Sequence, residues 1–365
     1  MERINTSQLG AMIVLFQIGS TTLFEPGIEL RQDVWLVVLL SCLSGLLLLA
    51  LYLTIQRRDP ENNVFGMLIR YFGPWIGRVA VCFYIVFFAY ESMRNVRDFG
   101  DLTNLTVLPR TPMQIVMLVF TLLSVYALFK GIEVFFRFAE FIVIAVIGFY
   151  ALLVLLFILS GVVAVERMFP ILSSGPLPIV TQVGLEGVWF PFGQMFVFLT
   201  FWRFLQEKQR PALRRASLRA YLISSTVILT MNVLILCALG PELTKVSTIP
   251  LLQATQLIQL ADILERFDAL VFLLLYVGIF VKATLWFLAA VLGLGELFRL
   301  HYRYFVLPVG GAIYAAALLP RSWQEHLATG ELVAIQYKLN PIALGVVPIL
   351  LLAVMLIKGR LGKES

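Results

Sequence analysis

One basic residue, Lys282, stands inside an apolar stretch that is long enough to cross a membrane. The stretch covers residues 271–298 and reads VFLLLYVGIFVKATLWFLAAVLGLGELF. It is too long and too apolar for a helix of a soluble core, so the sequence predicts a transmembrane span. An ammonium group in the middle of a bilayer costs at least roughly 2.5–3.5 kcal/mol. Such a group is retained where it faces a partner, a cavity or a pathway, which favours a transporter, a channel or a ligand sensor over an inert anchor.

A second group of charges lies in the predicted span 78–107. Glu91, Arg94, Asp98 and Asp101 follow one another at intervals of three or four residues, so they share one face of a helix. A charged stripe inside a helical bundle predicts a water-filled vestibule that leads outward. The alternative is that this span ends near residue 95 and that the later charges belong to an external surface helix.

The composition places the whole chain in a membrane. Of its 365 residues, 60% are hydrophobic and only 14% are charged, which leaves too little polar surface for a soluble domain. The apolar runs predict an all-α protein of about ten transmembrane helices in a single domain, 1–365. We expect the spans at residues 9–30, 33–56, 78–107, 112–129, 134–163, 180–205, 217–240, 267–298, 303–319 and 341–358. The segment 250–265 has helical spacing but is too short and polar to cross, so we place it at the membrane surface or over a vestibule.

Lysines and arginines predict the orientation of the spans, because cytoplasmic loops carry an excess of them. If both termini are cytoplasmic, 18 of the 28 basic residues lie inside, seven lie outside and three, Arg94, Arg97 and Lys282, lie within spans. This bias predicts an integral membrane protein with both termini in the cytoplasm. It also assigns the basic cluster 203–219 to an anionic inner leaflet, so we expect no nucleic-acid partner despite the net charge of +6.

The first and sixth spans carry residues that interrupt helices. Span 9–30 contains FQIGSTTLFEPG, and span 180–205 contains EGVWFPFGQMF. Gly and Pro weaken a helix, and backbone groups that they free in a bilayer persist only beside protein or water. Half-helix ends at such breaks offer N–H and C=O groups to a small ligand or ion. The alternative is that both sites are packing kinks.

Ten spans divide into two groups of five, which we assign to residues 1–163 and 164–365. A repeat with an odd number of spans must invert when it is duplicated, and inverted repeats are typical of secondary transporters. The first span of each half should then be the interrupted one, as the sequence has it. We therefore expect a five-plus-five inverted repeat with broken helices 1 and 6.

Several stretches of the chain resemble the endospore germination permeases, the B subunits of nutrient germinant receptors. They are KGIEVFFRFAE (130–140), MFPIL (168–172), WFPFGQM (189–195) and IPLLQATQLIQLADILERFDALVFLLLYVGIFVKATLW (249–286). The likeness covers nearly the whole chain. It implies membership of the amino acid–polyamine–organocation transporter superfamily, whose fold is a five-plus-five inverted repeat. The chain departs from the pattern at Gln194, where many members carry glutamate. A neutral amide cannot take up and release a proton, so we do not expect proton coupling at this position.

The resemblance implies a binding site between spans 1, 3, 6 and 8. In that fold, the spans that hold Glu91 and Lys282 are equivalent by symmetry and flank the broken helices. We therefore expect these two charges to pair and to offset each other's desolvation, either for packing alone or as part of the site. The other residues that we assign to substrate binding are Gly19, Ser20, Thr21, Thr22, Phe190, Gln194 and Thr284. Main-chain N–H groups at 19–22 would hold a carboxylate, and carbonyl groups at the second break would meet an ammonium.

By this resemblance the chain is a receptor subunit that binds a small nutrient, an amino acid by expectation, and signals germination in the bacterial cell membrane or spore inner membrane. Its expected partners are the germinant receptor A subunit, the lipoprotein C subunit and membrane lipid. The rival hypotheses are a cation-coupled amino-acid transporter, with Lys282 as the coupling group, and an ion or water channel lined by the charged stripe. We expect no enzyme, no cofactor and no metal site. The sequence has no phosphate-binding loop, no metal-ligand spacing and no histidine at membrane depth to activate a nucleophile.

Overall fold

The computed structural model describes residues 2–24, 27–173, 175–258 and 267–361, and within them the chain is helical without any named strand. The α-helices are α1 (Thr6–Ile18), α2 (Val34–Arg58), α3 (Val64–Phe72), α4 (Pro74–Thr106), α5 (Met113–Lys130), α6 (Ile132–Leu159), α7 (Pro176–Gln182), α8 (Leu213–Leu239), α9 (Pro241–Val246), α10 (Pro250–Gln256), α11 (Phe267–Phe298), α12 (Arg303–Ala317), α13 (Trp323–Glu331), α14 (Leu339–Pro341) and α15 (Val347–Leu361). Short 3-10 and π turns link them, at η1 (Thr21–Leu23), η2 (Ile28–Asp33), η3 (Val165–Met168), η4 (Val183–Gly187), η5 (Phe192–Thr200), η6 (Trp202–Phe204), η7 (Glu207–Ala212), η8 (Leu332–Gln336) and η9 (Ile342–Val346).

Eight helices of the described chain are long and apolar enough to cross a membrane. The two further predicted spans, 9–30 and 303–319, are present as shorter helices. α1 has 13 residues because it ends at Gly19, and α12 has 15. The predicted positions of the spans are therefore confirmed, and the first span is interrupted as expected.

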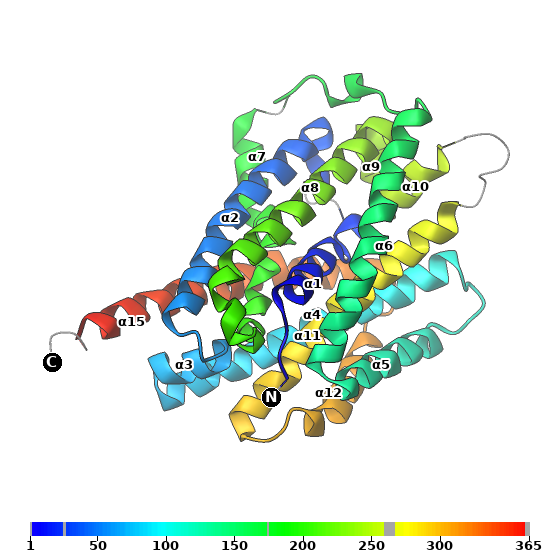
Figure 1. Ribbon diagram of the computed structural model, residues 1–365. Coiled ribbons are helices and arrows are strands. Elements are labelled where there is room, and N and C mark those ends of the chain that lie inside the picture. The colour runs from blue at the N-terminus through cyan, green and yellow to red at the C-terminus, as the bar shows by residue number, and fades with distance from the viewer. Residues whose placement is uncertain (1, 25–26, 174, 259–266, 362–365) are drawn as a thin grey trace.

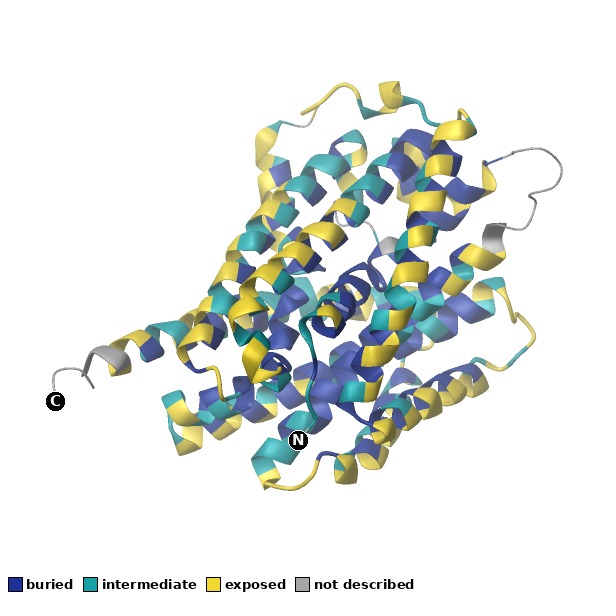
Figure 2. Cartoon of the chain, viewed as in Figure 1, coloured by how far each residue is buried: buried dark blue, intermediate teal, exposed yellow. Residues whose placement is uncertain are grey.

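α1 lies in the centre of the bundle and packs against α6, α8 and α11 (Figure 1). It begins with a capping box, in which the Asn5 side chain accepts the Gln8 N–H and the Gln8 side chain accepts the Asn5 N–H. From Leu9 to Ser20 nearly every residue is buried, whereas the outer helices show exposed faces (Figure 2). A helix that is apolar all round belongs in a core, which explains why so short a helix holds this position.

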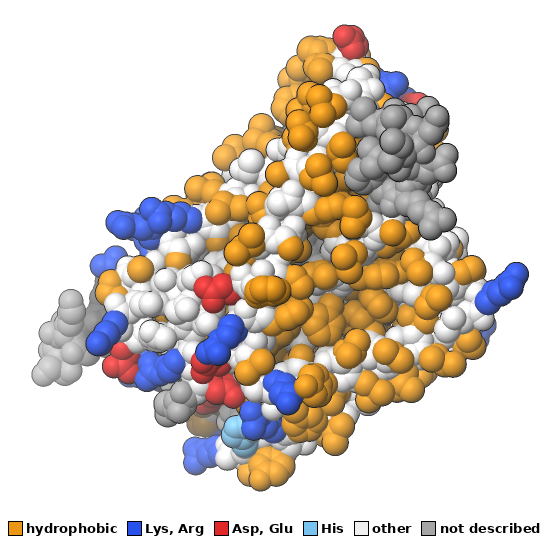
Figure 3. Space-filling view, turned by 45° about the vertical axis from the view of Figure 1, so that its right-hand side comes forward, with side chains coloured by type: hydrophobic (Ala, Val, Ile, Leu, Met, Phe, Trp, Pro, Cys, Tyr) orange, Lys and Arg blue, Asp and Glu red, His pale blue; other side chains and the backbone are white. Residues whose placement is uncertain are grey.

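α4 and α11, which correspond to the third and eighth predicted spans, lie against each other along much of their length. The outer helices α2, α5 and α6 carry large apolar side chains that face outward, such as Leu47 and Phe141. Figure 3 shows hydrophobic side chains across the middle of one face, with many of the charged side chains gathered toward one end. This distribution fits a protein whose sides contact lipid.

One end of the molecule, here called the basic end, is fastened by ion pairs between distant segments. Arg3 bonds Glu207 at 2.8 Å, Arg203 bonds Glu296 at 3.2 Å, and Arg210 bonds Glu61. The opposite end is fastened by other pairs, among them Lys245 with Glu29 at 2.5 Å. The placement of the basic end in the cytoplasm stays a prediction from the count of basic residues.

The polar segment 250–265 does not lie flat on a surface in its described part. α10 buries Leu251, Leu252 and Ala254 and packs on α8, α11 and η1. Residues 259–265 lie outside the described residues. The sequence predicts a place for this segment either at the membrane surface or over a vestibule. Its described part, α10, supports the second placement, because it covers the break in the first span.

Candidate ligand site at the two helix breaks

The first break begins at Gly19, where α1 stops. The Gly19 N–H still donates to the Leu15 carbonyl at 2.8 Å, but its ψ of −114° turns the chain out of the helix. Ser20 and Thr21 follow as buried residues, and the Thr21 hydroxyl donates to the Gln17 carbonyl at 2.6 Å. The side chain of Thr22 lies outside the described residues. The break therefore places polar backbone and small side chains at the centre of the bundle.

α11 approaches this break closely through two residues that are one turn apart, Gly278 and Lys282. A Cβ atom on Gly278 would lie 2.7 Å from the Gly19 carbonyl oxygen, and one on Gly19 would lie 2.9 Å from the Lys282 Cδ. Both contacts are too short for a real side chain, so both positions need glycine. The stem of Lys282 therefore packs directly on the broken backbone.

The Lys282 ammonium is fully buried, at 0% exposure, and lies between aromatic rings. Its Nζ lies 4.5 Å from the centre of the Phe190 ring and 5.5 Å from that of Phe16. A cation over a ring face gains roughly 2 kcal/mol when both are desolvated. In the part of the chain that the structure describes, the Nζ has no hydrogen-bond partner. The rings replace part of its lost hydration, but they accept no hydrogen bond of ordinary strength.

The second break lies between α7 and η5. The π turn η4 ends at Gly187, the Trp189 N–H bonds the Glu186 carbonyl at 3.0 Å, and the chain resumes as the 3-10 helix η5 beyond Pro191. Pro191 has no N–H to donate, which prevents a continuous helix here. The Tyr52 hydroxyl bonds the Gly193 carbonyl at 3.1 Å, which ties the start of η5 to α2. This turn places Phe190 beside Lys282.

Gln194, on the first turn of η5, contacts Glu91 of α4. The Gln194 Nε2 donates to the Glu91 Oε2 at 3.2 Å, and both side chains are buried. The predicted ion pair between Glu91 and Lys282 is wrong, because no N–O distance of 4.0 Å or less joins them. The Glu91 charge acts on Lys282 only through space. The positions of two residues in their spans predict a similar depth in the membrane. They do not predict whether the two side chains are close enough to bond.

Four buried polar atoms around the two breaks have no hydrogen-bond partner among the described residues. They are the Oε1 and Nε2 of Gln17, the Oε1 of Gln194 and the Nζ of Lys282. An unsatisfied buried group costs about 1–3 kcal/mol, so a ligand that supplied partners to these four atoms would recover part of that cost. Donors and acceptors together are what a small zwitterion requires.

Gln17 was missed by the sequence analysis. It was recognisable, because it is the one amide in the apolar stretch 9–18 and it stands two residues before the break. The Thr284 side chain does not point toward the breaks. Its hydroxyl lies 2.9 Å from that of Ser124 on α5, and two residues along a helix point to nearly opposite sides. The structure thus brings Gly19, Phe190 and Lys282 together, buries Ser20 directly after Gly19, and joins Gln194 to Glu91.

α13 covers the outer side of these breaks, and we call it the lid. The Phe24 ring packs edge-on against Phe190 at 6.2 Å and stacks on the lid residue Trp323 at 6.0 Å. The lid residue His326 is buried and its Nε2 lies 2.8 Å from the Asp98 Oδ1 on α4. A row of aromatic rings therefore connects the lid to Lys282.

The charged stripe of α4 is enclosed by the lid and its neighbours. Arg97 bonds Asp101 at 2.6 Å and donates to the Pro320 carbonyl at 2.6 Å. Any Cβ on the lid residue Gly330 would collide with the Arg94 guanidinium. The predicted open vestibule is therefore wrong for this structure, and so is its alternative, since α4 continues to Thr106 with Arg97 and Asp98 buried.

Comparisons with known proteins place this arrangement in a family. Residues 3–326 match the model of a family described as spore germination protein. The chain is 30% identical over 330 residues to spore germination protein KB of Bacillus subtilis (strain 168), which covers 90% of this chain and 88% of that protein. The chain belongs to the spore germination permease family. Another Bacillus subtilis relative of this permease, spore germination protein YndE, is 21% identical over 364 residues, or 96% of each chain.

Two solved structures share the fold of this germination permease. Mhp1, a nucleobase-cation-symport-1 family transporter in a closed conformation with bromovinylhydantoin bound, matches with a TM-score of 0.71 at 12% identity, over 94% of this chain and 78% of that one. MhsT in complex with L-phenylalanine matches with a TM-score of 0.60 at 14% identity, over 98% and 99%. These likenesses show the fold alone, and they confirm the predicted five-plus-five architecture with broken helices 1 and 6. The family and the structural relatives are permeases and transporters rather than enzymes.

Proposed function

We propose that this permease is the nutrient-binding B subunit of a germinant receptor, and that its ligand is a small amino acid held at the two helix breaks. The observation that carries the proposal is the set of unpaired buried atoms on Gln17, Gln194 and Lys282. A protein that only needed a packed core would fill these positions with apolar side chains. Unpaired donors and acceptors at unwound backbone instead suit a ligand that brings the missing partners.

A zwitterion matches the charges of the site. Its carboxylate would lie against the Lys282 ammonium beside the break at Gly19, because an anion is stabilised by a desolvated cation. Its ammonium would meet the amide oxygens of Gln17 and Gln194, which have no partner among the described residues. The side chain of the ligand would contact the ring of Phe190, which favours a compact apolar amino acid. The fold relative MhsT, whose structure holds L-phenylalanine, supports this ligand class.

Binding would become a signal if the ligand prefers one arrangement of the lid. A ligand shifts an equilibrium only by its difference in affinity for the two states. Here the row Phe190, Phe24 and Trp323 connects the ligand to α13 at the surface. We propose that A-type and lipoprotein C-type partner subunits in the spore inner membrane read the position of this surface, with the basic end in the cytoplasm.

Binding and uptake measured on the same proteoliposomes test the proposal. The purified chain should bind a labelled amino acid saturably without accumulating it. Lys282→Met should lower the affinity by about 10-fold or more, the size of a lost charge-assisted hydrogen bond. Lys130→Met is the matched control, because Lys130 also lies over a ring, that of Tyr126 at 5.0 Å, but is exposed. Equal binding by both variants would remove Lys282 from the site.

Accumulation of the amino acid inside the vesicles would favour the second candidate, a cation-coupled transporter. The observation that favours this candidate is the fold, which is shared with a nucleobase-cation-symport-1 family transporter. Uptake that depends on a sodium or proton gradient would establish it. Saturable binding with no uptake under any gradient would leave the receptor.

A further inference from the structure

A groove of about 520 Å³ opens at the basic end between α2 and α8, away from both helix breaks. One wall is the α2 face that carries Leu46, Leu49 and Leu53, at spacings of three and four residues. The other wall includes Leu213 and Leu218 of α8 and Trp202 of η6, and the polar side chains of Thr54 and Gln56 also line the groove. The interior of the groove is therefore a mostly apolar channel that runs along α2.

Both apolar walls end in arginine at the basic end. The stripe of α2 continues from Leu53 to Arg57, and that of α8 leads back from Leu218 to Arg214. Arg57 and Arg214 are exposed, and among the described residues neither has a carboxylate within 4.0 Å. A third lining arginine, Arg210, is neutralised by Glu61. The mouth of the groove therefore carries two uncompensated positive charges.

The carboxyl of Glu61 stays ionised beside Arg210. The Arg210 guanidinium, through its hydrogen bond and its charge, lowers the pKa of Glu61 from its ordinary value. At neutral pH the pair therefore contributes no net charge to the mouth. The two exposed arginines therefore leave the mouth with a net positive charge that favours an anion from outside this chain.

The length of the groove and its position on the lipid-facing side of α2 favour a membrane lipid as its ligand. Leu46 and Arg57 are eleven residues apart on a helix, or about 16 Å, which matches about half of a hydrocarbon core of about 30 Å. The neighbouring α2 residues Leu43 and Leu47 are 52% and 74% exposed, so this side of α2 faces lipid. A ligand that enters here is itself a component of the membrane. We propose that the groove binds an anionic phospholipid, with an acyl chain along α2 and the phosphate between Arg57 and Arg214.

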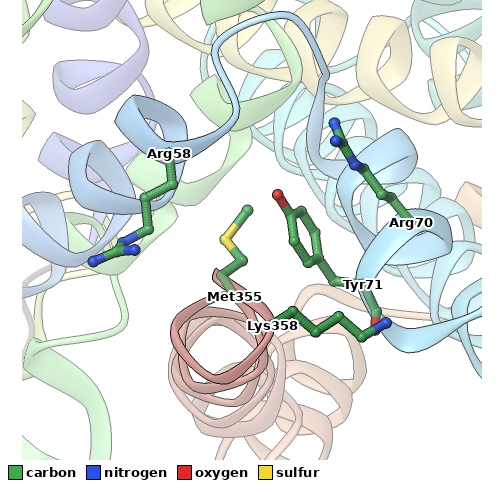
Figure 4. Close-up of a pocket in the computed structure, with 5 residues that line it drawn as sticks. All are labelled: Arg58, Arg70, Tyr71, Met355 and Lys358. Atoms are coloured by element: carbon green, nitrogen blue, oxygen red, sulfur yellow. The ribbon is translucent and has the colours of Figure 1, made fainter. Parts of the chain in front are cut away.

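A second basic pocket lies beside the same end of α2 and serves as a comparison. Its volume is about 390 Å³, and it is lined by Arg58, Arg70, Tyr71, Met355 and Lys358 (Figure 4). Met355 is its one aliphatic side chain, so it has no wall for an acyl chain. Arg70 bonds Asp59 at 3.3 Å and Lys358 bonds the Tyr71 carbonyl at 3.0 Å, so two of its cations are already engaged. Both the groove and this pocket are basic, so charge does not distinguish them. The groove differs from the pocket in having an apolar channel.

Native mass spectrometry of the full-length, delipidated chain with dioleoylphosphatidylglycerol tests the proposal. The double variant Arg57→Gln, Arg214→Gln should bind this lipid about 30-fold more weakly, the effect of removing two arginines at a membrane surface. Arg58→Gln is the matched control, since it removes the adjacent exposed arginine and leaves the groove intact. Leu53→Trp fills the channel without changing its charge and should also weaken binding. Equal melting temperatures of all variants would establish that each is folded.

Three results would overturn the proposal. The first is equal lipid binding by the double variant and by Arg58→Gln. The second is unchanged binding by Leu53→Trp, which would place the acyl chain elsewhere. The third is equal competition by glycerophosphoglycerol, which has the headgroup without the tails and would identify the groove as a site for a soluble anion. Dioleoylphosphatidylcholine, which has the same tails and no net charge, should bind as weakly to the native chain as the charged lipid binds to the double variant.

Discussion

Two polar clusters on α4 lie about two turns apart and differ in one respect. In the lid cluster, Arg97, Asp98 and Asp101 all have bonded partners, and His326 closes the cluster from the lid. In the break cluster, Glu91 has one bond from Gln194, while atoms of Gln194 and Lys282 remain unpaired. A buried polar cluster is stable when all its members are satisfied, and a partly satisfied one is costly. The lid cluster therefore stabilises the structure, and the unpaired atoms of the break cluster support the ligand site that we propose.

The largest expected effect is on the stability of the lid cluster. Arg97→Met keeps the length of the side chain but leaves Asp101 and the Pro320 carbonyl without their donor. Removal of one partner from a buried ion pair costs about 3–5 kcal/mol. We expect a clearly lower melting temperature of the purified protein. A melting temperature equal to that of the native chain would mean that the lid cluster does not hold the structure.

Lys282→Met should act in the opposite direction on stability. It removes a buried charge that has no hydrogen bond among the described residues, so the free energy of unfolding should stay the same or rise by about 1 kcal/mol, while the affinity for the amino acid falls by about 10-fold or more. Thermal unfolding and ligand binding measured on one preparation check both halves of this statement. A loss of stability as large as that of Arg97→Met would erase the difference between the two clusters.

Trp323→Ala tests the contact between the lid cluster and the break cluster, which runs through Phe24 and Phe190. It removes the stack on Phe24, which is expected to contribute about 0.5–1.5 kcal/mol. If the lid closes over the ligand, the dissociation rate should rise by about 2- to 10-fold at this energy. Gln324→Ala, on the exposed side of the same helix, is the control and should leave the rate unchanged. Stopped-flow release of labelled amino acid measures both, and identical rates would separate the lid from the site.

The smallest effect is expected from Thr284→Val. The change removes the hydrogen bond to Ser124 and should lower the free energy of unfolding by about 0.5–1.5 kcal/mol. Ligand affinity should not change, because the hydroxyl faces α5 rather than either break. A weaker affinity with unchanged stability would restore Thr284 to the binding site, as the sequence had predicted.

The helices and their breaks followed from the sequence, because apolar runs fix the length of a span and Gly or Pro marks its interruption. The rotation of each helix did not follow. Lys282 and Thr284 were assigned to one site, yet two residues along a helix face different neighbours. The sequence also did not predict which groups bond the charged residues of α4. His326 and the Pro320 carbonyl come from a polar connecting segment that gives no sign of folding back over the bundle.

The boundary of the two repeats near residue 163 and the roles of Ser20 and Thr21 in binding stay predictions. The roles of Ser20 and Thr21 depend on a ligand, and the boundary depends on a superposition of the two halves; neither is determined by the pattern of apolar residues. The groove beside α2 was equally invisible in the sequence. Its two exposed arginines, Arg57 and Arg214, were counted there as signs of membrane orientation, and Arg214 as part of a basic cluster at an anionic leaflet, with no sign that they share a groove.

The anchoring of Lys282 has a mechanical consequence. Its side chain starts on α11, rests on Gly19 of the first half and ends beneath Phe190 of the second break. Any sliding of one broken segment past the other would therefore have to move this side chain. A carboxylate bound to the ammonium, as we propose for the ligand, would change the contacts of Lys282 with both breaks at once.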